Sequence, residues 1–591
     1  MNHADLPEIQ YTVWPADLHG HHFRVKLHIT NPDPNGQVLQ MPAWIPGSYL
    51  IRDFSKQIES IEAYSIAGIR KKIALERIDN DHWRLPPVGG AIEVLTTIYA
   101  FDSSVRAAYI DTERAFFNAT SLCLAVKGQE HVPCSLAITT PEAAFADHWT
   151  VQTTLRAAKT DERGFGFYLA KNYDELLDHP AAMGEFQLVH WKSNGVAHRM
   201  AIQGCNHIVD AKRLAEDLQA ICTSTINLFE PKTKRAPFGE YLFLVNAVLN
   251  GYGGLEHRNS TALLCKRDQI PQENILFEES AYREFLGLCS HEYFHAWLVK
   301  RIQPKAFQPY DLAKRNHTRL LWVFEGFTSY YDDLQLLRSK RIDLKTYLKL
   351  VANNWNGILR GPGRHKQSLA DSSFDAWTKY YQADENTPNA VVSYYGKGAL
   401  LALGLDLQIR AFTKNKQSLD DLMRLLWHKH GHHGIPEDGL DVLVDELLGS
   451  GFSKTWADIK ARYIFGVEDI PLQKWIGSNL IAVKPKTLST LEKIKLQFGM
   501  RHTDANGWLK VTHVLDGGAA QAAGLAAGDL LASIDGQRIS SARWDKVLGS
   551  INGNLPVRIT FYRDDLEHER MVSLKTIKIP TQYDLTPKKD A

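Results

Sequence analysis

The chain changes character near residue 175. Before that point, segments such as 11–14, 23–30 and 91–100 alternate apolar and polar residues, or run apolar with many β-branched side chains, and turn-forming Asn-Pro, Asn-Gly and Pro-Pro-Val-Gly-Gly sequences separate them. Beyond it, a segment such as 210–229 has apolar residues at helical spacing. We therefore expect a multidomain α+β protein whose N-terminal β-sandwich-like domain precedes a mainly helical part.

The sequence His-Glu-Tyr-Phe-His at 291–295 lies within the helical part. It belongs to a run, residues 279–301, in which apolar residues recur at helical spacing. Ser280 is a suitable N-cap and Pro304 stops the pattern. These signals predict one helix over the whole run.

On such a helix, His291 and His295 lie one turn apart and share a face. Two imidazoles at this spacing can ligate one Zn²⁺, and Glu292 can serve as general base toward the water that zinc activates. A catalytic zinc usually has three protein ligands, and Glu325, an acid among aromatic residues, is the best downstream candidate. The alternatives are a helix that simply buries two histidines, and a Glu325 stabilised by a helix N-terminus.

A glycine-rich stretch follows a predicted buried strand at 241–249. Gly253 and Gly254 permit a close backbone approach to a ligand, and Glu256 would place a carboxylate at the edge of such a cleft. A protonated amine is the natural partner of that carboxylate. Taken alone, the stretch is more typical of a glycine-rich strand end with a solvated acid.

Composition excludes some partners and indicates a compartment. The 591 residues have a formal net charge of +1, so no overall field favours nucleic acid or an anionic membrane, and neither partner is expected. No run approaches about 18 apolar residues, and the first residues lack the pattern of a signal peptide. Six dispersed cysteines without a CxxC pair favour reduced thiols. A cytoplasmic protein is expected.

Five segments together resemble a known family. They are Trp-Ile-Pro-Gly-Ser-Tyr-Leu-Ile-Arg-Asp-Phe at 44–54, Gly-Gly-Leu-Glu-His at 253–257, the motif at 291–295, Glu-Gly-Phe-Thr-Ser-Tyr-Tyr at 325–331 and Tyr-Tyr-Gly-Lys-Gly at 394–398. In order and identity they are similar to the glycyl-aminopeptidase family of zinc metallopeptidases, relatives of aminopeptidase N among the thermolysin-like gluzincins. The resemblance covers nearly the whole chain and implies a thermolysin-like catalytic domain.

The resemblance implies a single zinc ion per chain. Its ligands would be His291, His295 and Glu325, and Glu292 would be the general base. In aminopeptidase N a shorter segment separates the second histidine from the glutamate, so the intervening residues here must loop out and return.

The resemblance also implies how substrate is held. Glu256, with Gly253 and Gly254, matches the signature that binds the free α-amine, and Tyr395 matches a tyrosine that donates a hydrogen bond to the tetrahedral oxyanion. From the residues alone, Tyr395 is equally consistent with packing. His257 replaces the Asn that follows this glutamate in aminopeptidase N, a departure from the family's pattern at the amine-binding segment.

Two polar stretches of the helical part invite other interpretations. Residues 361–373 predict a long loop near the active site. The sequence His-Lys-His-Gly-His-His at 428–433 resembles a metal tract, but a helix end with basic residues followed by a glycine turn is the preferred interpretation.

The C-terminal segment resembles a bacterial-type PDZ domain. Phe498, Gly499 and Met500 stand in place of its carboxylate-binding loop, and residues 518–538 carry its Ala-Gly-Leu-x-x-Gly-Asp and Ile-Asp-Gly elements. Such a module offers a sheet edge to peptide C-termini. Gln497 departs from the usual small or apolar residue, so a structural appendage is the alternative.

These observations predict a domain plan and a function. The plan is a β-rich domain at 1–175, a thermolysin-like peptidase domain at 176–483, a PDZ domain at 484–580 and a tail at 581–591. The function is a zinc aminopeptidase that hydrolyses the N-terminal bond of peptides, and the family name suggests Gly or Ala as the preferred residue. A zinc endopeptidase, or a peptide-binding scaffold with an inert zinc site, is the alternative.

Overall fold

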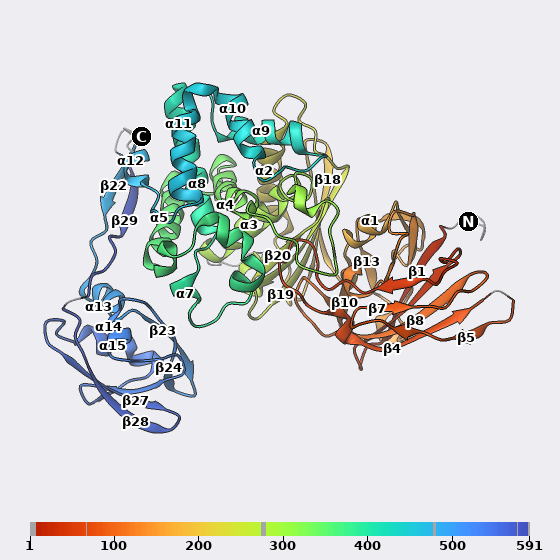
Figure 1. Cartoon of the computed structure of the whole chain (residues 1–591), viewed down its shortest axis with the longest axis horizontal. Coiled ribbons are helices and arrows are strands. Elements are labelled where there is room, and N and C mark those ends of the chain that lie inside the picture. Colours follow the sequence, from red (N-terminus) through yellow and green to blue (C-terminus); the bar gives the residue numbers. More distant parts are fainter. Residues whose placement is uncertain (1–6, 67, 274–278, 477–479, 576, 589–591) are drawn as a thin grey trace. The chain divides into compact units, whose positions relative to one another are not determined.

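The computed structural model describes residues 7–66, 68–273, 279–476, 480–575 and 577–588. The chain forms two compact units. The first contains residues up to 316 together with 338–341 and 423–436, and the second contains 317–337, 342–422 and the segment from 437 onward. Figure 1 labels the elements of both units.

The N-terminal part of the first unit is built from β-sheets, as the alternating segments predict. One sheet of eight strands has the order β14 (Arg156–Thr160), β15 (Gly166–Ala170), β12 (Cys134–Ile138), β1 (Ile9–Asp17), β2 (His22–Ile29), β8 (Ile92–Tyr99), β4 (Ile58–Ser65) and β5 (Lys71–Ile73). Two sheets of four strands accompany it: β13 (Thr150–Gln152), β16 (Ala181–Gly184), β10 (Arg114–Phe117) and β9 (Ala108–Ile110); and β11 (Ala125–Val126), β3 (Val38–Gln40), β7 (His82–Arg84) and β6 (Glu76–Arg77). Because β16 pairs with β10 and β13, the first of these four-stranded sheets continues beyond residue 175.

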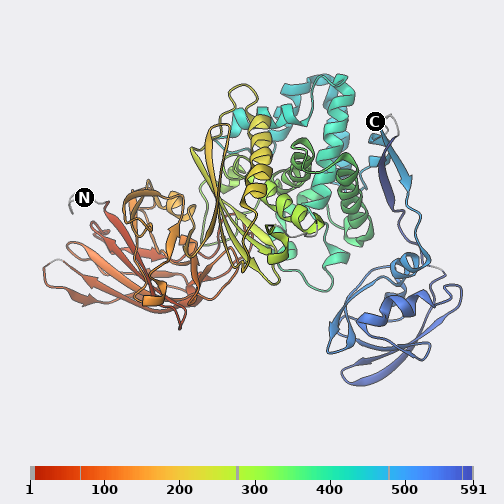
Figure 2. The ribbon, with the colours of Figure 1, turned by 180° about the vertical axis from the view of Figure 1, so that it is seen from behind.

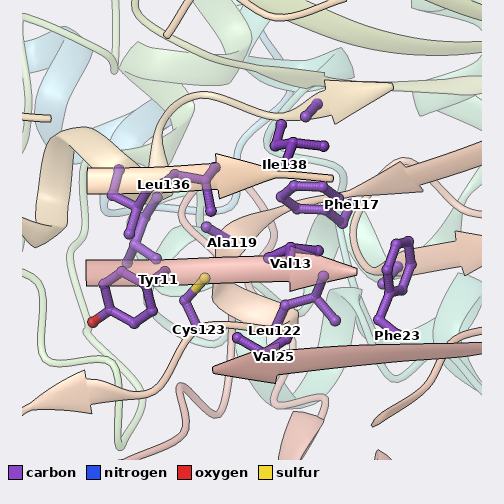
Figure 3. Close-up of a cluster of buried hydrophobic side chains, with 14 of the residues drawn as sticks. Tyr11, Val13, Phe23, Val25, Phe117, Ala119, Leu122, Cys123, Leu136 and Ile138 are labelled. Atoms are coloured by element: carbon purple, nitrogen blue, oxygen red, sulfur yellow. The ribbon is translucent and has the colours of Figure 1, made fainter. Parts of the chain in front are cut away.

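Period-two burial explains these sheets. Along β1 and β8, buried residues alternate with more exposed ones, so one face of each strand packs inward. Figure 3 shows part of the resulting core, in which Tyr11 and Val13 of β1 lie among side chains of β2, β10 and β12 and of the segment that contains Cys123. Burial of these apolar faces stabilises the domain.

A five-stranded sheet follows in the first unit. Its order is β17 (Gln187–Ser193), β18 (Val196–Gln203), β19 (Glu240–Val248), β21 (Ser260–Lys266) and β20 (Gly253–Glu256), so β20 is an edge strand. Helix α2 (Ala211–Phe229), yellow in Figure 2, packs against β17, and α3 (Glu279–Phe294) contacts α2, β20 and β21. The predicted helix at 210–229 and strand at 241–249 are confirmed, and Asp210 caps α2 by accepting from the backbone N–H of Arg213.

The helix that carries the metal motif is shorter than predicted. We expected one helix over 279–301, but α3 ends at Phe294, and Ser280 lies inside its first turn instead of capping it. The backbone N–H of His295 still donates to the carbonyl of His291 (3.2 Å), so the helical spacing of the two histidines is kept. The chain then turns, and Val299 has a left-handed φ of 82°.

Helices dominate the region between 321 and 475, in agreement with the prediction. They are α4 (Leu321–Arg338), α5 (Leu344–Arg360), α6 (Leu369–Phe374), α7 (Thr387–Ala390), α8 (Gly396–Thr413), α9 (Leu419–His430), α10 (Gly439–Leu448), α11 (Ser450–Ile459) and α12 (Leu472–Trp475). The long loop predicted at 361–373 is wrong, because a 3-10 turn at Pro362–His365 and α6 occupy it. Ser368 caps α6, a local signal that the polar composition hides.

The histidine tract at 428–433 is the end of a helix, as preferred from the sequence. Helix α9 ends at His430, and the next residues form a turn. Within the described residues, this tract forms no cluster of three metal-ligating side chains.

The C-terminal module is a small β domain in the second unit. Its strands β23 (Met500–Ala505), β24 (Trp508–Val514), β25 (Leu530–Ile534), β27 (Val557–Arg563) and β28 (Leu566–Val572) form one sheet, with the short β26 (Gln537–Arg538) beside β25. Helices α13 (Thr490–Phe498), α14 (Ala519–Ala522) and α15 (Trp544–Gly549) complete its core.

The segment expected to be a tail contains a strand. β29 (Tyr583–Pro587) pairs with β22 (Ile481–Pro485), the strand that precedes the module. The side chain of Asn356 on α5 donates to the carbonyl of Tyr583 and accepts from its N–H, and the ring of Trp355 stacks on Tyr583 at 4.3 Å. Both strands are therefore fixed to the helical part of the second unit.

The six cysteines are free thiols, as the sequence predicts. In the described part of the chain, every helix is too short or too polar to cross a lipid bilayer.

Candidate metal centre and substrate site

The end of α3 brings His291 and His295 together. Their Nε2 atoms lie 3.1 Å apart and their ring planes are inclined by 84°. His295 is buried, and its Nδ1 lies 3.0 Å from the carbonyl oxygen of Leu298. Nδ1–H therefore donates to that carbonyl, which leaves the lone pair of Nε2 directed toward His291. This tautomer is the one that a metal-ligating histidine requires.

Glu325 is the third member of this group. It lies in the second turn of α4 and is buried. One ligand atom from each of His291, His295 and Glu325 lies within 4.8 Å of the others, a group that could hold a metal ion.

The geometry and chemistry of this group fit zinc. Tetrahedral zinc with bonds of about 2.0–2.1 Å would separate two nitrogen ligands by about 3.3 Å, close to the observed 3.1 Å. Two imidazoles and one carboxylate are a donor set of catalytic zinc sites that keep the fourth position open.

A glycine contact fixes the helix that carries Glu325. A Cβ on Gly326 would lie 2.6 Å from the Cα of Gly398, and a Cβ on Gly398 would lie 2.9 Å from the Cα of Gly326. Helices α4 and α8 can approach so closely only because both positions are glycine. The glycine after Glu325 and the last glycine of the 394–398 segment are thus explained by packing.

Glu292 faces strand β20. The residue is only 5% exposed, and a Cβ on Gly254 would lie 2.1 Å from its Oε1 atom. Any side chain at position 254 would collide with this carboxylate, so glycine is required there. The carboxylate next to the metal group and the backbone of β20 are therefore adjacent.

Glu256 ends β20 with a buried carboxylate. It is 4% exposed, and Oε1 has no hydrogen-bond partner among the described residues. Gly47 lies directly against the carboxylate, since a Cβ there would be 2.6 Å from Oε1. A buried carboxylate oxygen without a partner is costly, and a ligand ammonium would satisfy it. The 44–54 segment thus contributes a wall to this site.

His257 points into a buried ionic cluster instead of sharing the role of Glu256. Its Nδ1 lies 3.3 Å from Oδ1 of Asp178, and Nζ of Lys300 lies 2.7 Å from the same oxygen. The backbone N–H of Arg258 donates to the other oxygen of Asp178 (3.1 Å). Burial alone would raise the pKa of Asp178, but the charges of Lys300 and Arg258 hold it well below its ordinary value. Burial lowers the pKa of His257, which keeps that ring neutral.

Removing the charge of Asp178 should destabilise the protein. In Asp178→Asn the Lys300 ammonium, 5% exposed, loses its carboxylate, and we expect the free energy of unfolding to fall by about 3–5 kcal/mol. The folded-state pKa of Asp178 is depressed, so its contribution is present above the unfolded pKa of about 3.9 and is lost on acidification. Urea unfolding at neutral and acid pH measures this difference. Asp33→Asn, at an exposed turn, is the control; equal effects of the two substitutions would contradict the prediction.

Tyr395 lies at the N-terminus of α8. Its ring stacks on Tyr394 (4.7 Å between centroids) and on Tyr380 (5.6 Å), and its hydroxyl lies 3.4 Å from that of Tyr381. Burial, and next the negative charge of Glu325, raise the pKa of Tyr395 well above its ordinary value. The phenol therefore keeps its proton and stays a hydrogen-bond donor at neutral and alkaline pH.

The three residues expected to bind a peptide carboxylate in the PDZ module have different positions. Phe498 is buried in the core against Trp544, and Gly499 caps α13 with a left-handed φ of 65° while its N–H donates to the carbonyl of Lys495. Met500 begins edge strand β23, and both Phe498 and Met500 line a groove of about 530 Å³. Gln497 does not reach the groove, because its amide donates to the carbonyl of Leu574.

An ion pair lies at this groove. Nζ of Lys495 on α13 is 2.6 Å from Oδ1 of Asp545 on α15, and both residues line the groove together with His502 and Trp544. This ion pair and the ionic cluster around His257 were both missed by sequence reasoning. They share one property: their partners are distant in sequence, so no local pattern reports them.

The fold and the metal group define a class. An HExxH helix whose histidines meet a buried glutamate from a following helix is the arrangement of gluzincin metallopeptidases. Comparisons with known proteins identify the family within this class. Family models match at three places: the M61 peptidase N-terminal domain at 10–185, M61 glycyl aminopeptidase at 284–401 and the PDZ domain at 489–555.

Solved structures are similar as well. The crystal structure of an aminopeptidase N family protein from Idiomarina loihiensis is 37% identical, with a TM-score of 0.92 over 98% of this chain and 98% of that one. An M1 zinc metallopeptidase from Deinococcus radiodurans is 12% identical (TM-score 0.47; 79% and 95% covered), and yeast LTA4 hydrolase is 12% identical (TM-score 0.46; 80% and 69% covered). A comparison with curated proteins gave no match.

The chain belongs to the M61 glycyl aminopeptidase family of zinc metallopeptidases and carries the PDZ domain expected from its sequence. It is a metallo-aminopeptidase, and its substrates are peptides.

Proposed function

We propose that this protein removes single N-terminal residues from peptides, with Gly or Ala preferred, by means of one zinc ion held by His291, His295 and Glu325. The observation that carries the proposal is the buried carboxylate of Glu256, whose Oε1 has no partner in the described residues. It ends the same short strand whose Gly254 lies against Glu292. An amine held at Glu256 fixes the scissile bond one residue away. The preference for small residues is supported by the description of the family.

The chain's own residues perform the proton transfers and the positioning. Zinc, when bound, polarises the scissile carbonyl and makes a water molecule acidic enough to act as nucleophile near neutral pH. Glu292 accepts the proton of that water and later delivers it to the leaving amine. Glu256 orients the free α-amine, and β20 is an edge strand along which the peptide backbone can lie.

Tyr395 serves as an oxyanion donor in this proposal. Its raised pKa keeps the phenolic proton in place, so it can donate to the oxygen that becomes negative as the tetrahedral intermediate forms. Tyr380 and Tyr394, which both stack against it, limit the motion of its ring.

The decisive experiment compares free and N-acetylated peptides. The zinc-loaded enzyme should hydrolyse Gly-Gly-Gly and leave its N-acetyl derivative intact, because acetylation removes the charge that Glu256 requires. Glu256→Gln should lower kcat/KM for the free peptide roughly 10- to 100-fold, the range expected for loss of a charged hydrogen bond, whereas Glu240→Gln at the exposed start of β19 should not. Equal cleavage of both peptides would instead indicate an endopeptidase.

We infer that the PDZ groove accepts peptide C-termini. It lies beside β23, an edge strand that can pair with an added peptide strand. We also place the protein in a reducing compartment such as the cytoplasm, which its six free thiols support.

A further inference from the structure

Arg106 lies at the opposite end of β20 from Glu256. Its Nη2 donates to the carbonyl of Gly254 (3.1 Å), and a Cβ on Gly253 would lie 3.7 Å from both Nη atoms. The guanidinium therefore covers the start of the strand along which the substrate is proposed to lie.

The loop that carries Arg106 is held firmly. It connects β8 to β9, and the side chain of Asn118, fully buried, donates to the carbonyls of Val105 and Ala107 on both sides of Arg106. The backbone N–H of Arg106 donates to Oγ of Ser104. A side chain presented from such a loop is pre-organised for binding.

The charge of Arg106 has no counter-ion in the described residues. No carboxylate of that part of the chain lies within 4.0 Å of its guanidinium, and its Nε is buried without a hydrogen-bond partner. A half-buried guanidinium in this state favours a ligand carboxylate, which it can bind through two parallel hydrogen bonds.

The order of groups along β20 sets the direction of the substrate. Glu256 lies at one end, Glu292 lies against Gly254, and Arg106 lies against Gly253. If the α-amine is at Glu256 and the scissile bond near Glu292, the leaving residue extends toward Arg106. Positions 253 and 256 are about 10 Å apart along a strand, and an extended peptide advances about 3.3–3.6 Å per residue. The terminal carboxylate of a dipeptide or tripeptide reaches this guanidinium.

We propose that Arg106 recognises the C-terminal carboxylate of short substrates, so that the enzyme prefers di- and tripeptides with a free C-terminus; this rests on the function proposed above. Arg106 is a specificity residue in this scheme, and it takes no part in the proton transfers. Longer peptides carry their carboxylate past the guanidinium and gain nothing from it.

The test compares acids with amides. For the zinc-loaded wild type, kcat/KM for Gly-Gly should exceed that for Gly-Gly-amide roughly 10- to 100-fold, mainly through KM, whereas pentaglycine and its amide should be cleaved alike. Arg106→Gln should bring the Gly-Gly ratio close to one, and Arg106→Lys should restore part of it. Arg156→Gln, at an exposed arginine of β14, should keep the wild-type ratio.

Two results would overturn the assignment: a wild-type acid-to-amide ratio near one, or a ratio that survives in Arg106→Gln. The first needs no variant, so a misfolded substitution does not prevent the test. Release of glycine from Gly-p-nitroanilide by the wild type reports the aminopeptidase activity separately. Its absence would count against the proposed function, whereas a wrong ratio with that activity present counts against Arg106 alone.

Discussion

Glu292→Gln should bind zinc as the wild type does and lose roughly 10²- to 10⁴-fold in kcat, the range typical of a general acid–base group. The amide keeps the size of the carboxylate beside Gly254, so α3 and β20 need not move. It cannot accept a proton from water, so turnover falls although the metal ligands are untouched. Elemental analysis of zinc and the rate of glycine release from Gly-p-nitroanilide measure the two properties.

The matched control for Glu292 is on the same helix. Glu284→Gln makes the same change at an exposed position of α3, and should leave zinc content and kcat near wild-type values. Near-normal kcat in a metal-replete Glu292→Gln protein would exclude this residue as the base. Loss of zinc from the variant would show instead that the carboxylate supports the metal group.

Tyr395→Phe should lower kcat by roughly 10²- to 10³-fold, the loss seen when one oxyanion donor is removed. The substitution keeps the ring that stacks on Tyr380 and Tyr394, so only the hydroxyl is lost. Because the donor acts in the transition state, KM should change little. Steady-state kinetics with Gly-p-nitroanilide separate kcat from KM.

The pH dependence offers a second check on Tyr395. Its pKa lies well above the ordinary value near 10, so no loss of activity below that pH should come from its ionisation, and the alkaline limb should be the same in Tyr395→Phe. Tyr562→Phe, at a hydroxyl that donates to Glu567 in the PDZ module, is the control and should be fully active. A Tyr395→Phe enzyme with wild-type kcat would assign this tyrosine to packing.

Local patterns in the sequence predicted most of the fold and the centre of the site. The alternating pattern of β1, the helical periodicity of 210–229 and the spacing of His291 and His295 are properties of a few consecutive residues, and each is confirmed by the structure. Glu325 was found because a buried acid among aromatics needs a partner. Such features are readable because their physical cause lies within one element.

The features that were predicted wrongly or missed depend on contacts between residues far apart in the sequence, or on turns that no local sequence signal marks. No glycine or proline marks the end of α3 at Phe294. In the turn that follows, the carbonyl of Leu298 accepts a hydrogen bond from the His295 ring and Val299 adopts a left-handed backbone conformation. The orientation of the His257 side chain depends on its contact with Asp178, a residue far from it in the sequence. The position of Arg106 against β20 was missed for the same reason, because Arg106 and Gly254 are far apart in the sequence.

The pairing of β22 with β29 alters how the PDZ module is attached. β22, which enters the module, pairs with β29, which leaves it. Asn356 of α5 is hydrogen-bonded to β29. The module is thus an insertion attached through two paired strands, and not a domain joined by a single linker. A shortened enzyme without it would need residue 485 linked to residue 583 by a tight hairpin, because cutting the chain before β29 would strip α5 of its cover and leave β22 as a bare edge.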